Sequence, residues 1–456
     1  MSSNSTRNDM LVGSIWDKLL WFAIPLALTN IMQQLFNAAD IAIVGQFVGK
    51  HALAAVGANG VVVNLFLNLF VGLSIGTNVL ISTLVGRKDD RRVSAAVHTS
   101  LAIAVVSGIV LALLGLVCSR QILILLSTPT EILDDAVLYL KIICLGMPFL
   151  LCFNFASAIL RSVGDSKTSM WVMCITGFVN VILNLLFVLC LDMTVDGVAF
   201  ATILSTALGA YILIRVLVRS KGSVRLHYKQ IRFHRTELKF IAKIGVPAGV
   251  QGMMFSFSNI CIQFAMNQLG YEYIAASAAA LNYEFLAYFL LNSFAMATVT
   301  FIGVNYGALQ FDRCKKIVRL SLIMDGCVTV VFSVIVVVFA ELCMLLYTTD
   351  SVLIEHGVLR LRYILSFELL NVFIEVLSGA LRGIGISLMP AVICFFGICC
   401  FRVLWVYAVF ENYKSFSVLM MAYPISWIIT FIFLSVFYWH IGKNKFNQKH
   451  TITEAG

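Results

Sequence analysis

The sequence predicts an all-α integral membrane protein with twelve transmembrane helices in two pseudo-symmetric six-helix bundles, arranged as parallel repeats. Three observations predict this fold: an apolar composition, long apolar segments between short polar connections, and an internal repeat of constant offset. Of the 456 residues, 60% are hydrophobic and 12% are charged, whereas a soluble domain typically carries about 25% charged residues. The composition therefore excludes a water-soluble protein of this length.

Twelve apolar segments are long enough to cross a bilayer, because about 20 helical residues span roughly 30 Å of hydrocarbon. They lie near residues 15–44, 53–84, 94–118, 137–160, 168–190, 196–218, 238–268, 274–304, 317–346, 358–381, 388–410 and 416–441. The chain is accordingly expected to have five parts. These are an N-terminal tail (1–14), an N-lobe (15–219, helices 1–6), a basic linker (220–236), a C-lobe (237–442, helices 7–12) and a C-terminal tail (443–456).

Basic residues concentrate in alternate connections between these segments. The second connection holds Arg87, Lys88, Arg91 and Arg92, and the linker is similarly basic, whereas the odd-numbered connections hold mainly acids such as Asp134 and Asp350. Cytoplasmic loops carry an excess of Lys and Arg, so a multi-pass protein with both termini in the cytoplasm is predicted. The net charge of +9 then reflects topology and contact with anionic lipid head groups, and no nucleic-acid partner is expected.

The two halves of the sequence repeat at one offset. Gly49 and Gly270 are 221 residues apart (270 − 49), and the same offset relates Arg92 to Arg313 and Leu160-Arg161-Ser162-Val163-Gly164 to Leu381-Arg382-Gly383-Ile384-Gly385. Each half has six crossings, an even number, so both halves enter the membrane in the same orientation. Repeats of this kind are typical of transporters, with a substrate site at the interface of the halves.

Several motifs resemble those of one transporter family. Pro25, Asp40, Val44-Gly45 and Gly49 resemble the first-helix signature of the multidrug and toxic compound extrusion (MATE) exporters, and Leu160 to Lys167 is similar to their L-R-G-x-G-D loop, with Ser162 in place of the usual glycine. Asp196 to Thr202 is similar to a third family segment. The resemblance covers essentially the whole chain and is nearer the bacterial DinF/MepA-type branch than the NorM branch. It implies a secondary antiporter of the bacterial cytoplasmic (inner) membrane that exports organic, mainly cationic compounds as H⁺ or Na⁺ enters.

One candidate site lies in the N-lobe. An aspartate inside a spanning helix costs roughly 2.5–3.5 kcal/mol on insertion scales, so Asp40 is expected to face a cavity or a partner. Asn180 and Asn184 are spaced i, i+4 and share a helix face, and counting from the helix ends puts Asn184 and Thr202 at the depth of Asp40, with Asn37 one turn away. These oxygens suit a proton or Na⁺ at Asp40, and the resemblance implies a coupling site at Asp40, Asn180 and Thr202. The alternative is that Asp40 caps a helix end.

A second polar layer is predicted in the C-lobe. Gln251, Glu284, Glu368 and Arg402 fall near mid-membrane, with Glu375 deeper. Glu368 and Arg402 are predicted to pair as a structural or functional bridge. Glu284 has no evident basic partner at its depth and is the predicted site for a cationic substrate, the alternative being a protonated or water-facing structural acid. Further candidate substrate-binding residues are Gln251, Asn282, Asn371, Glu368, Glu375, Tyr283 and Tyr288; for each amide the alternative is a hydrogen bond between helices.

The remaining expectations concern partners and rival functions. We expect small organic cations and membrane lipids as partners, no resident cofactor or metal apart from the coupling ion, and a monomer. A membrane enzyme is disfavoured because no converging acid–base or metal-binding set is evident. The alternatives that stay open are a lipid-linked oligosaccharide flippase, which needs a cationic cavity for pyrophosphate, and a metabolite exporter of narrow specificity.

Overall fold

The computed structural model describes residues 10–126 and 128–445, and every regular element in these ranges is helical. Most of the two predicted tails, residues 1–9 and 446–456, lies outside the described residues. By length and composition, ten helices can cross a membrane, or twelve when each of two bent helix pairs counts as one span. The predicted all-α fold with twelve spans is therefore confirmed.

The chain divides into two compact units whose boundaries fall inside helices. The first unit runs from Ile24 to Val246, and the second combines the described residues before Ile24 with those from Pro247 onward. Each boundary lies next to a proline within a helix, Pro25 or Pro247. A proline removes one backbone hydrogen bond from its helix. The first helix of each predicted lobe is thus divided between the two units near its proline.

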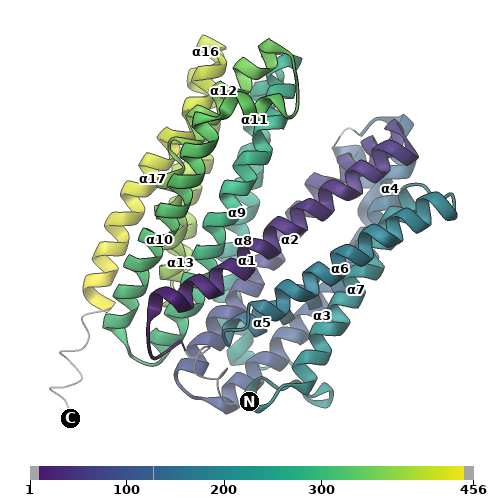
Figure 1. Ribbon diagram of the computed structural model, residues 1–456. Helices are drawn as coiled ribbons and strands as arrows, with labels where there is room; N and C mark the ends of the chain where they lie inside the picture. Colours follow the sequence, from purple (N-terminus) through teal and green to yellow (C-terminus); the bar gives the residue numbers. More distant parts are fainter. Residues whose placement is uncertain (1–9, 127, 446–456) are drawn as a thin grey trace. The chain divides into compact units, whose positions relative to one another are not determined.

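The first unit contains the part of α1 (Ile15–Ile43) that follows Ala23, then six whole α-helices and the start of a seventh. α6 and α7 run side by side, as do α3 and α5 (Figure 1). The elements after α1 are η1 (Val44–Val48), α2 (Lys50–Gly86), α3 (Asp90–Leu125), α4 (Thr130–Leu145), α5 (Met147–Ser162), α6 (Lys167–Leu185), η2 (Leu186–Cys190), α7 (Val195–Arg219), η3 (Gly222–Val224), η4 (Tyr228–Gln230) and the start of α8 (Arg235–Asn267).

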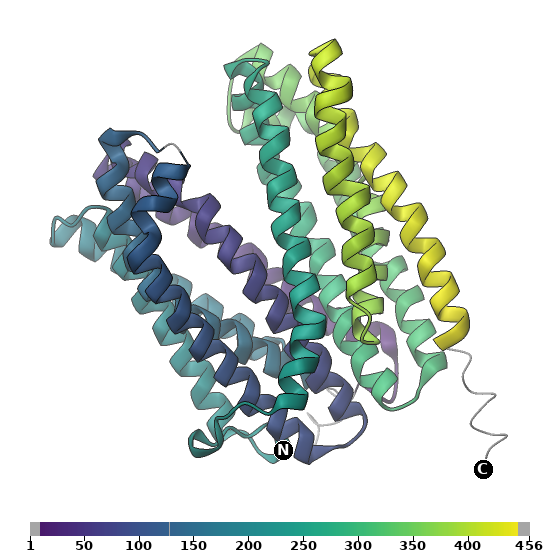
Figure 2. The same cartoon turned by 180° about the vertical axis from the view of Figure 1, so that it is seen from behind.

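The second unit contains the start of α1, the rest of α8 and the helices after it. Here α9 packs against α10, α12 and α13, and α17, drawn in yellow in Figure 2, packs against α12 and α13. The elements after α8 are α9 (Tyr271–Gly307), α10 (Phe311–Val338), α11 (Ala340–Leu345), α12 (Ser351–Leu365), α13 (Glu368–Gly383), α14 (Leu388–Cys394), η5 (Phe395–Cys400), α15 (Phe401–Trp405), η6 (Val406–Phe410), α16 (Glu411–Tyr413) and α17 (Phe416–Lys445).

The outward surface of α3 shows why these helices need an apolar solvent. Its buried residues pack in the core of the first unit, while large apolar side chains on the opposite face remain exposed, namely Val106, Ile109, Val110, Leu113, Leu114 and Val117. A monomeric soluble protein rarely exposes so continuous an apolar patch. The exposed face of α3 is therefore expected to contact lipid.

Both units bend one span at an equivalent place. α4 and α5 meet at 46° around Gly146, and α12 and α13 meet at 42° around Ser366 and Phe367. Pro148 in the first turn of α5 has no backbone N–H to donate, so the first break costs little hydrogen bonding. The two bends are related by nearly the same offset as the sequence repeat, so the repeat extends to backbone geometry.

Equivalent arginines hold the starts of α8 and α1, the helices that contain Pro247 and Pro25. In the first unit, Arg92 Nε donates to Glu237 Oε1 at the start of α8 across 2.9 Å. In the second unit, Arg313 Nη1 donates to the carbonyl oxygen of Gly13, just before α1, across 2.9 Å. Asn305 Nδ2 also donates to the carbonyl oxygen of Met10 at 3.2 Å. Arg92 and Arg313 are 221 residues apart, so arginines at equivalent positions of the repeat anchor a helix start in both units.

A close approach of two backbones positions the start of α8 on α2. A Cβ atom added to Gly76 would collide with the carbonyl oxygen of Ile241, and one added to Gly245 would collide with the backbone of Leu73. Small residues permit such close helix packing in membrane proteins.

We predict that Gly76→Ala lowers the melting temperature of the purified protein in detergent, because overpacking at a backbone contact costs about 1–3 kcal/mol. Gly60→Ala on the same helix is the matched control, since a Cβ there meets no atom within 4 Å. Thermal unfolding followed by size-exclusion chromatography measures both. If Gly76→Ala unfolds no earlier than Gly60→Ala, α2 and α8 do not touch as described.

Candidate functional site

The structure brings three of the predicted N-lobe residues together. Asn184 Nδ2 of α6 donates to Asp40 Oδ1 of α1 across 2.5 Å, and the same nitrogen lies 3.3 Å from Asn180 Oδ1. Asn180 and Asn184 are buried, as expected for one inward face of α6. Tyr139 of α4 lies within electrostatic range of Asp40. This grouping of Asp40, Asn180, Asn184 and Tyr139 is called the carboxylate–amide site below.

The carboxylate–amide site contains an unsatisfied acceptor oxygen. Asn184 Oδ1 is buried and has no hydrogen-bond partner among the described residues. A buried acceptor left without a donor costs about 1–3 kcal/mol. A proton on the carboxylate, or a hard cation bound by oxygens, would supply what these groups lack.

Two predicted members of this site take other positions. The hydroxyl of Thr202 donates to the carbonyl oxygen of Val198 in its own helix across 3.0 Å. Asn37 is exposed. In the described part of the chain, neither hydrogen bonds to Asp40. Counting turns from helix ends gives depth but not the direction of a side chain around its helix, which is why both residues were placed at the site.

In the second unit, Glu284 has a basic partner that the sequence analysis missed. Arg360 of α12 donates to both carboxylate oxygens of Glu284 on α9, with N–O distances of 2.6 and 2.9 Å. The predicted span began near residue 358, which placed Arg360 at a helix end. α12 instead begins at Ser351, where the Asp350 side chain accepts from Val352 N–H. Arg360 therefore lies well inside the helix, and the expectation that Glu284 lacks a basic partner is wrong.

The predicted ion pair between Glu368 and Arg402 does not form in the described structure. Arg402 Nε donates to Ser426 Oγ at 3.1 Å, and its guanidinium carbon lies 4.2 Å from the ring centroid of Tyr423. Glu368 accepts from Asn371 Nδ2 at 3.0 Å. A guanidinium over an aromatic face gains a cation–π attraction. The two side chains interact electrostatically, but an aromatic face and a hydroxyl on α17 satisfy the arginine.

Arg382 forms a further buried contact in this unit. Its Nη2 donates to Gln251 Oε1 of α8 across 2.9 Å, and both side chains are buried. The sequence analysis assigned Arg382 to a connection between helices, where it served only to orient the chain. It lies instead in the last turn of α13. Gln251 is therefore placed inside the second unit as predicted, with a partner that was not predicted.

Asp325 is a buried acid that the sequence analysis did not single out. It lies fully buried in the middle of α10, with Oδ1 accepting from Thr329 Oγ1 at 3.3 Å and Oδ2 without a hydrogen-bond partner. Glu368 and Glu375 of α13 interact with it electrostatically. A carboxylate far from the ends of the apolar segment 317–346 was the signal that could have identified it.

The remaining predicted residues contribute less to this polar layer. Asn282 is exposed and donates to the carbonyl oxygen of Ala278 in its own helix at 3.1 Å. The Tyr283 hydroxyl donates to the carbonyl oxygen of Cys343 at 3.0 Å, and the Tyr288 hydroxyl accepts from Asn292 Nδ2 at 3.2 Å. These contacts satisfy the polar groups locally.

Comparison with known proteins identifies the family. A family model described as MatE matches the chain twice, over residues 25–186 and 247–408. The chain belongs to this family. The two matches confirm the internal repeat, and they place the chain among membrane transporters rather than enzymes.

Relatives of similar length carry related names. The "Probable multidrug resistance protein YoeA" of Bacillus subtilis (strain 168) is 26% identical over 444 residues, which cover 95% of each chain. The "Probable multidrug resistance protein NorM" of Thermotoga maritima is 27% identical over 391 residues, covering 85% of this chain and 84% of that protein. A solved structure described as the outward-facing conformation of a multidrug resistance MATE family transporter superposes with a TM-score of 0.89. It is 21% identical and covers 96% of this chain and 98% of that one, which supports the shared fold.

We predict that Arg360→Gln destabilises this MatE-family chain by about 3–5 kcal/mol, because it leaves the Glu284 carboxylate buried without a partner. The double variant Glu284→Gln/Arg360→Gln should regain most of this loss, since two amides of similar shape replace the ions. Thermal unfolding in detergent measures both variants. Arg120→Gln, which breaks the exposed pair between Arg120 and Asp134, is the control and should change stability by at most about 1 kcal/mol. A double variant as unstable as Arg360→Gln would contradict the pairing.

Proposed function

We propose that this protein is a secondary active multidrug efflux antiporter that exports organic, mainly cationic compounds in exchange for H⁺ or Na⁺ by alternating access. The observation that carries the proposal is the carboxylate–amide site, found inside a chain of the MatE family. Relatives named as multidrug resistance proteins support the choice of substrates.

Asp40 is proposed to bind the coupling ion, with Asn184 and Asn180 as its partners. A lone charge in the apolar slab is unfavourable, and the unpartnered amide oxygen of Asn184 adds an acceptor beside it. A proton or Na⁺ would neutralise the carboxylate and satisfy these oxygens. Entry of one such ion supplies about 2.3 kcal/mol at a membrane potential of 100 mV, which can drive export of a substrate. No resident cofactor is proposed.

Glu368 is proposed as the carboxylate that attracts a cationic substrate, in place of Glu284. Arg360 neutralises Glu284 through two hydrogen bonds, whereas the described partner of Glu368 is the neutral amide of Asn371. Asp325 lies within electrostatic range of Glu368, as do Glu284 and Arg402. This part of the second unit therefore favours a positively charged guest.

The orientation follows from the basic connections. Residues of the α2–α3 turn and of the linker carry the excess of Lys and Arg, so we place this side of the protein and both termini in the cytoplasm. The proposed location is the cytoplasmic (inner) membrane of a bacterium, with the protein active as a monomer in contact with lipid.

A lipid-linked oligosaccharide flippase is kept as the second candidate because of three buried arginines in the second unit. The sequence analysis argued against a flippase from the lack of an arginine cluster, but Arg360, Arg382 and Arg402 are all buried there. Each already has partners within the unit: Glu284, Gln251 and Ser426, respectively. Although Arg382 Nε has no hydrogen-bond partner, each guanidinium is already bound within the unit, so we favour cationic substrates over a pyrophosphate.

We predict that purified protein in proteoliposomes moves ethidium against its gradient when a proton gradient or a sodium gradient is imposed, and that Asp40→Asn abolishes this coupled transport. An asparagine can neither bind a proton nor provide a charge for Na⁺. Dye fluorescence measures transport under each gradient alone, which also names the ion. Asp134→Asn, which removes an exposed carboxylate, should transport like the original protein.

Either of two results would reject this function. Coupled transport by Asp40→Asn equal to that of Asp134→Asn would remove Asp40 from the coupling site. Failure of the unaltered protein to move ethidium under both gradients, combined with translocation of a lipid-linked oligosaccharide, would establish the second candidate instead.

We predict that Glu368→Gln raises the KM for a cationic dye by about tenfold, corresponding to about 1.4 kcal/mol, while transport of a neutral dye changes little. The loss of one negative charge weakens attraction only for the charged substrate. Glu341→Gln, at an exposed position of α11, serves as the control. An equal change for both dyes would show that Glu368 acts on packing rather than on substrate charge.

A further inference from the structure

The segment that joins the two repeats is docked on the first unit rather than extended. The part of this linker that precedes α8, residues 220–234, carries the short helix η3, which packs against α3. Leu226 N–H donates to the carbonyl oxygen of Leu217 at 3.1 Å, and the Leu226 side chain is buried in the core of the first unit. Two histidine rings, His98 and His234, make the remaining contacts between the linker and α3.

The contacts of His98 require a neutral ring. His98 is 1% exposed, and its Nδ1 lies 2.6 Å from the carbonyl oxygen of Ser94, which can only accept. Its Nε2 lies 3.0 Å from the backbone nitrogen of His227, which can only donate. Nδ1 therefore carries the hydrogen and Nε2 offers a lone pair. A second proton on Nε2 would remove the acceptor that holds the linker at His227.

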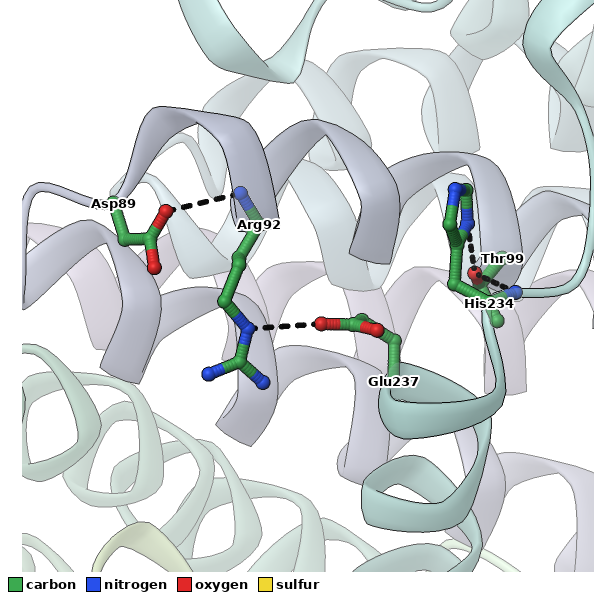
Figure 3. A network of polar contacts seen from close by, with 5 residues as sticks. All are labelled: Asp89, Arg92, Thr99, His234 and Glu237. Carbon is green, nitrogen blue, oxygen red and sulfur yellow. Dashed lines mark hydrogen bonds and ion pairs between the residues drawn. The ribbon is translucent and has the colours of Figure 1, made fainter.

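His234 holds the end of the linker on α3. Its Nδ1 and its backbone nitrogen both lie 3.1 Å from Thr99 Oγ1 on α3 (Figure 3). The Thr99 hydroxyl also donates to the carbonyl oxygen of Arg232 at 3.4 Å. The partner of His234 Nε2 is Arg232, itself a linker residue, at 3.1 Å. The contacts of His234 to α3 therefore do not use Nε2.

We propose that His98 is a second proton-binding site, distinct from Asp40, which acts as a latch. The linker is docked on α3 at His227 while the His98 ring is neutral, and this docking is lost when Nε2 binds a proton. The ligand is the proton itself, and the only bond exchanged is the hydrogen bond between His98 Nε2 and the backbone N–H of His227.

The charges around the His98 ring favour release once a proton binds. His227 stacks on His98 with ring centroids 6.3 Å apart, and His234 lies within electrostatic range of it. Two acids at this end are already engaged: Glu237 of α8 by Arg92, and Asp89 by the N–H of Arg92 (Figure 3). The neighbouring helices α2 and α5 end in basic residues, Arg87 and Arg161, and Asp90 lies in the first turn of α3 itself. A protonated ring therefore meets mainly positive charge and loses an acceptor.

The latch belongs to the first repeat alone. The offset of 221 relates His98 and Thr99 to Arg319 and Leu320, which have neither the ring nor the hydroxyl. The latch also ends where α8 begins, and α8 is the helix shared by the two units. Protonation would therefore act on the connection between the repeats.

Hydrogen–deuterium exchange of the full-length protein in lipid nanodiscs tests the latch directly. A solvated histidine has an ordinary pKa of about 6.5, and Nε2 of the docked His98 ring is occupied by the His227 N–H. Docking at His98 then weakens about tenfold between pH 7.5 and pH 5.5. We expect the protection factors of linker amides 222–234, corrected for intrinsic exchange, to fall about tenfold in the unaltered protein.

The matched variants are His98→Gln and His234→Gln, because a glutamine oxygen reaches the position of Nε2 as an acceptor and does not titrate. His98→Gln should remove the decrease, and His234→Gln should retain it, because His234 Nε2 does not contact α3. His440→Gln, at an exposed position of α17, should behave like the unaltered protein. Thr99→Val should expose the linker at both pH values, since it removes the hydroxyl that binds His234.

Two outcomes would overturn the proposal: linker protection independent of pH in the unaltered protein, or the same pH dependence in His98→Gln. If His98→Gln fails to fold, the unaltered protein and His234→Gln still decide, because loss of the pH dependence in His234→Gln would assign it to that ring and not to His98. The measurement requires no transported substrate, so it stands or falls independently of the proposed antiport.

Discussion

The structure depends on one constraint: a charged side chain inside an apolar slab must find its partner within its own unit. Asp40 meets an amide on α6, and Glu284 meets both donors of Arg360 across 2.6 and 2.9 Å. Arg402 is satisfied by a hydroxyl and an aromatic ring. Because an unpaired buried charge is strongly destabilising, these contacts fix how the helices of each unit face one another. They also leave a few unsatisfied oxygens as the places where an ion can act.

The same need for hydrogen-bond partners applies to α1 and α8, the two helices that are divided between the units. α1 and α8 contain prolines near the boundary, where the backbone ladder already lacks a hydrogen bond. Arg92 and Arg313 hold the beginnings of these helices through a side chain in one unit and a backbone carbonyl in the other. A proline-weakened helix whose beginning belongs to one unit and whose remainder belongs to the other is suited to bend near its proline when the units move differently. Alternating access, as proposed, requires such elements.

Hydropathy, loop charge and the 221-residue offset were enough to predict the helical fold and the repeat, because each depends only on sequence order. The spacing of Asn180 and Asn184 likewise placed them correctly with Asp40, since i, i+4 defines a face. The wrong predictions came from a misplaced helix start or from a side chain that points in another direction around its helix. Arg360 was missed because α12 begins at Ser351, capped by Asp350, rather than near residue 358. Arg402 was paired with Glu368 by depth alone, although its side chain points to Ser426 and Tyr423 on α17.

The two proposed proton sites of the first unit respond to a proton in opposite ways, and the hydrogen-bond inventory gives the reason. Beside Asp40, Asn184 Oδ1 has no partner, so a bound proton adds a donor where an acceptor is unsatisfied. At His98 both ring nitrogens are already used, so a bound proton breaks a complete set. The sites lie at opposite ends of the unit, since Asp40 adjoins the start of α2 and His98 the start of α3, which follows the end of α2. A proton at Asp40 would tighten one end, while a proton at the latch would loosen the other.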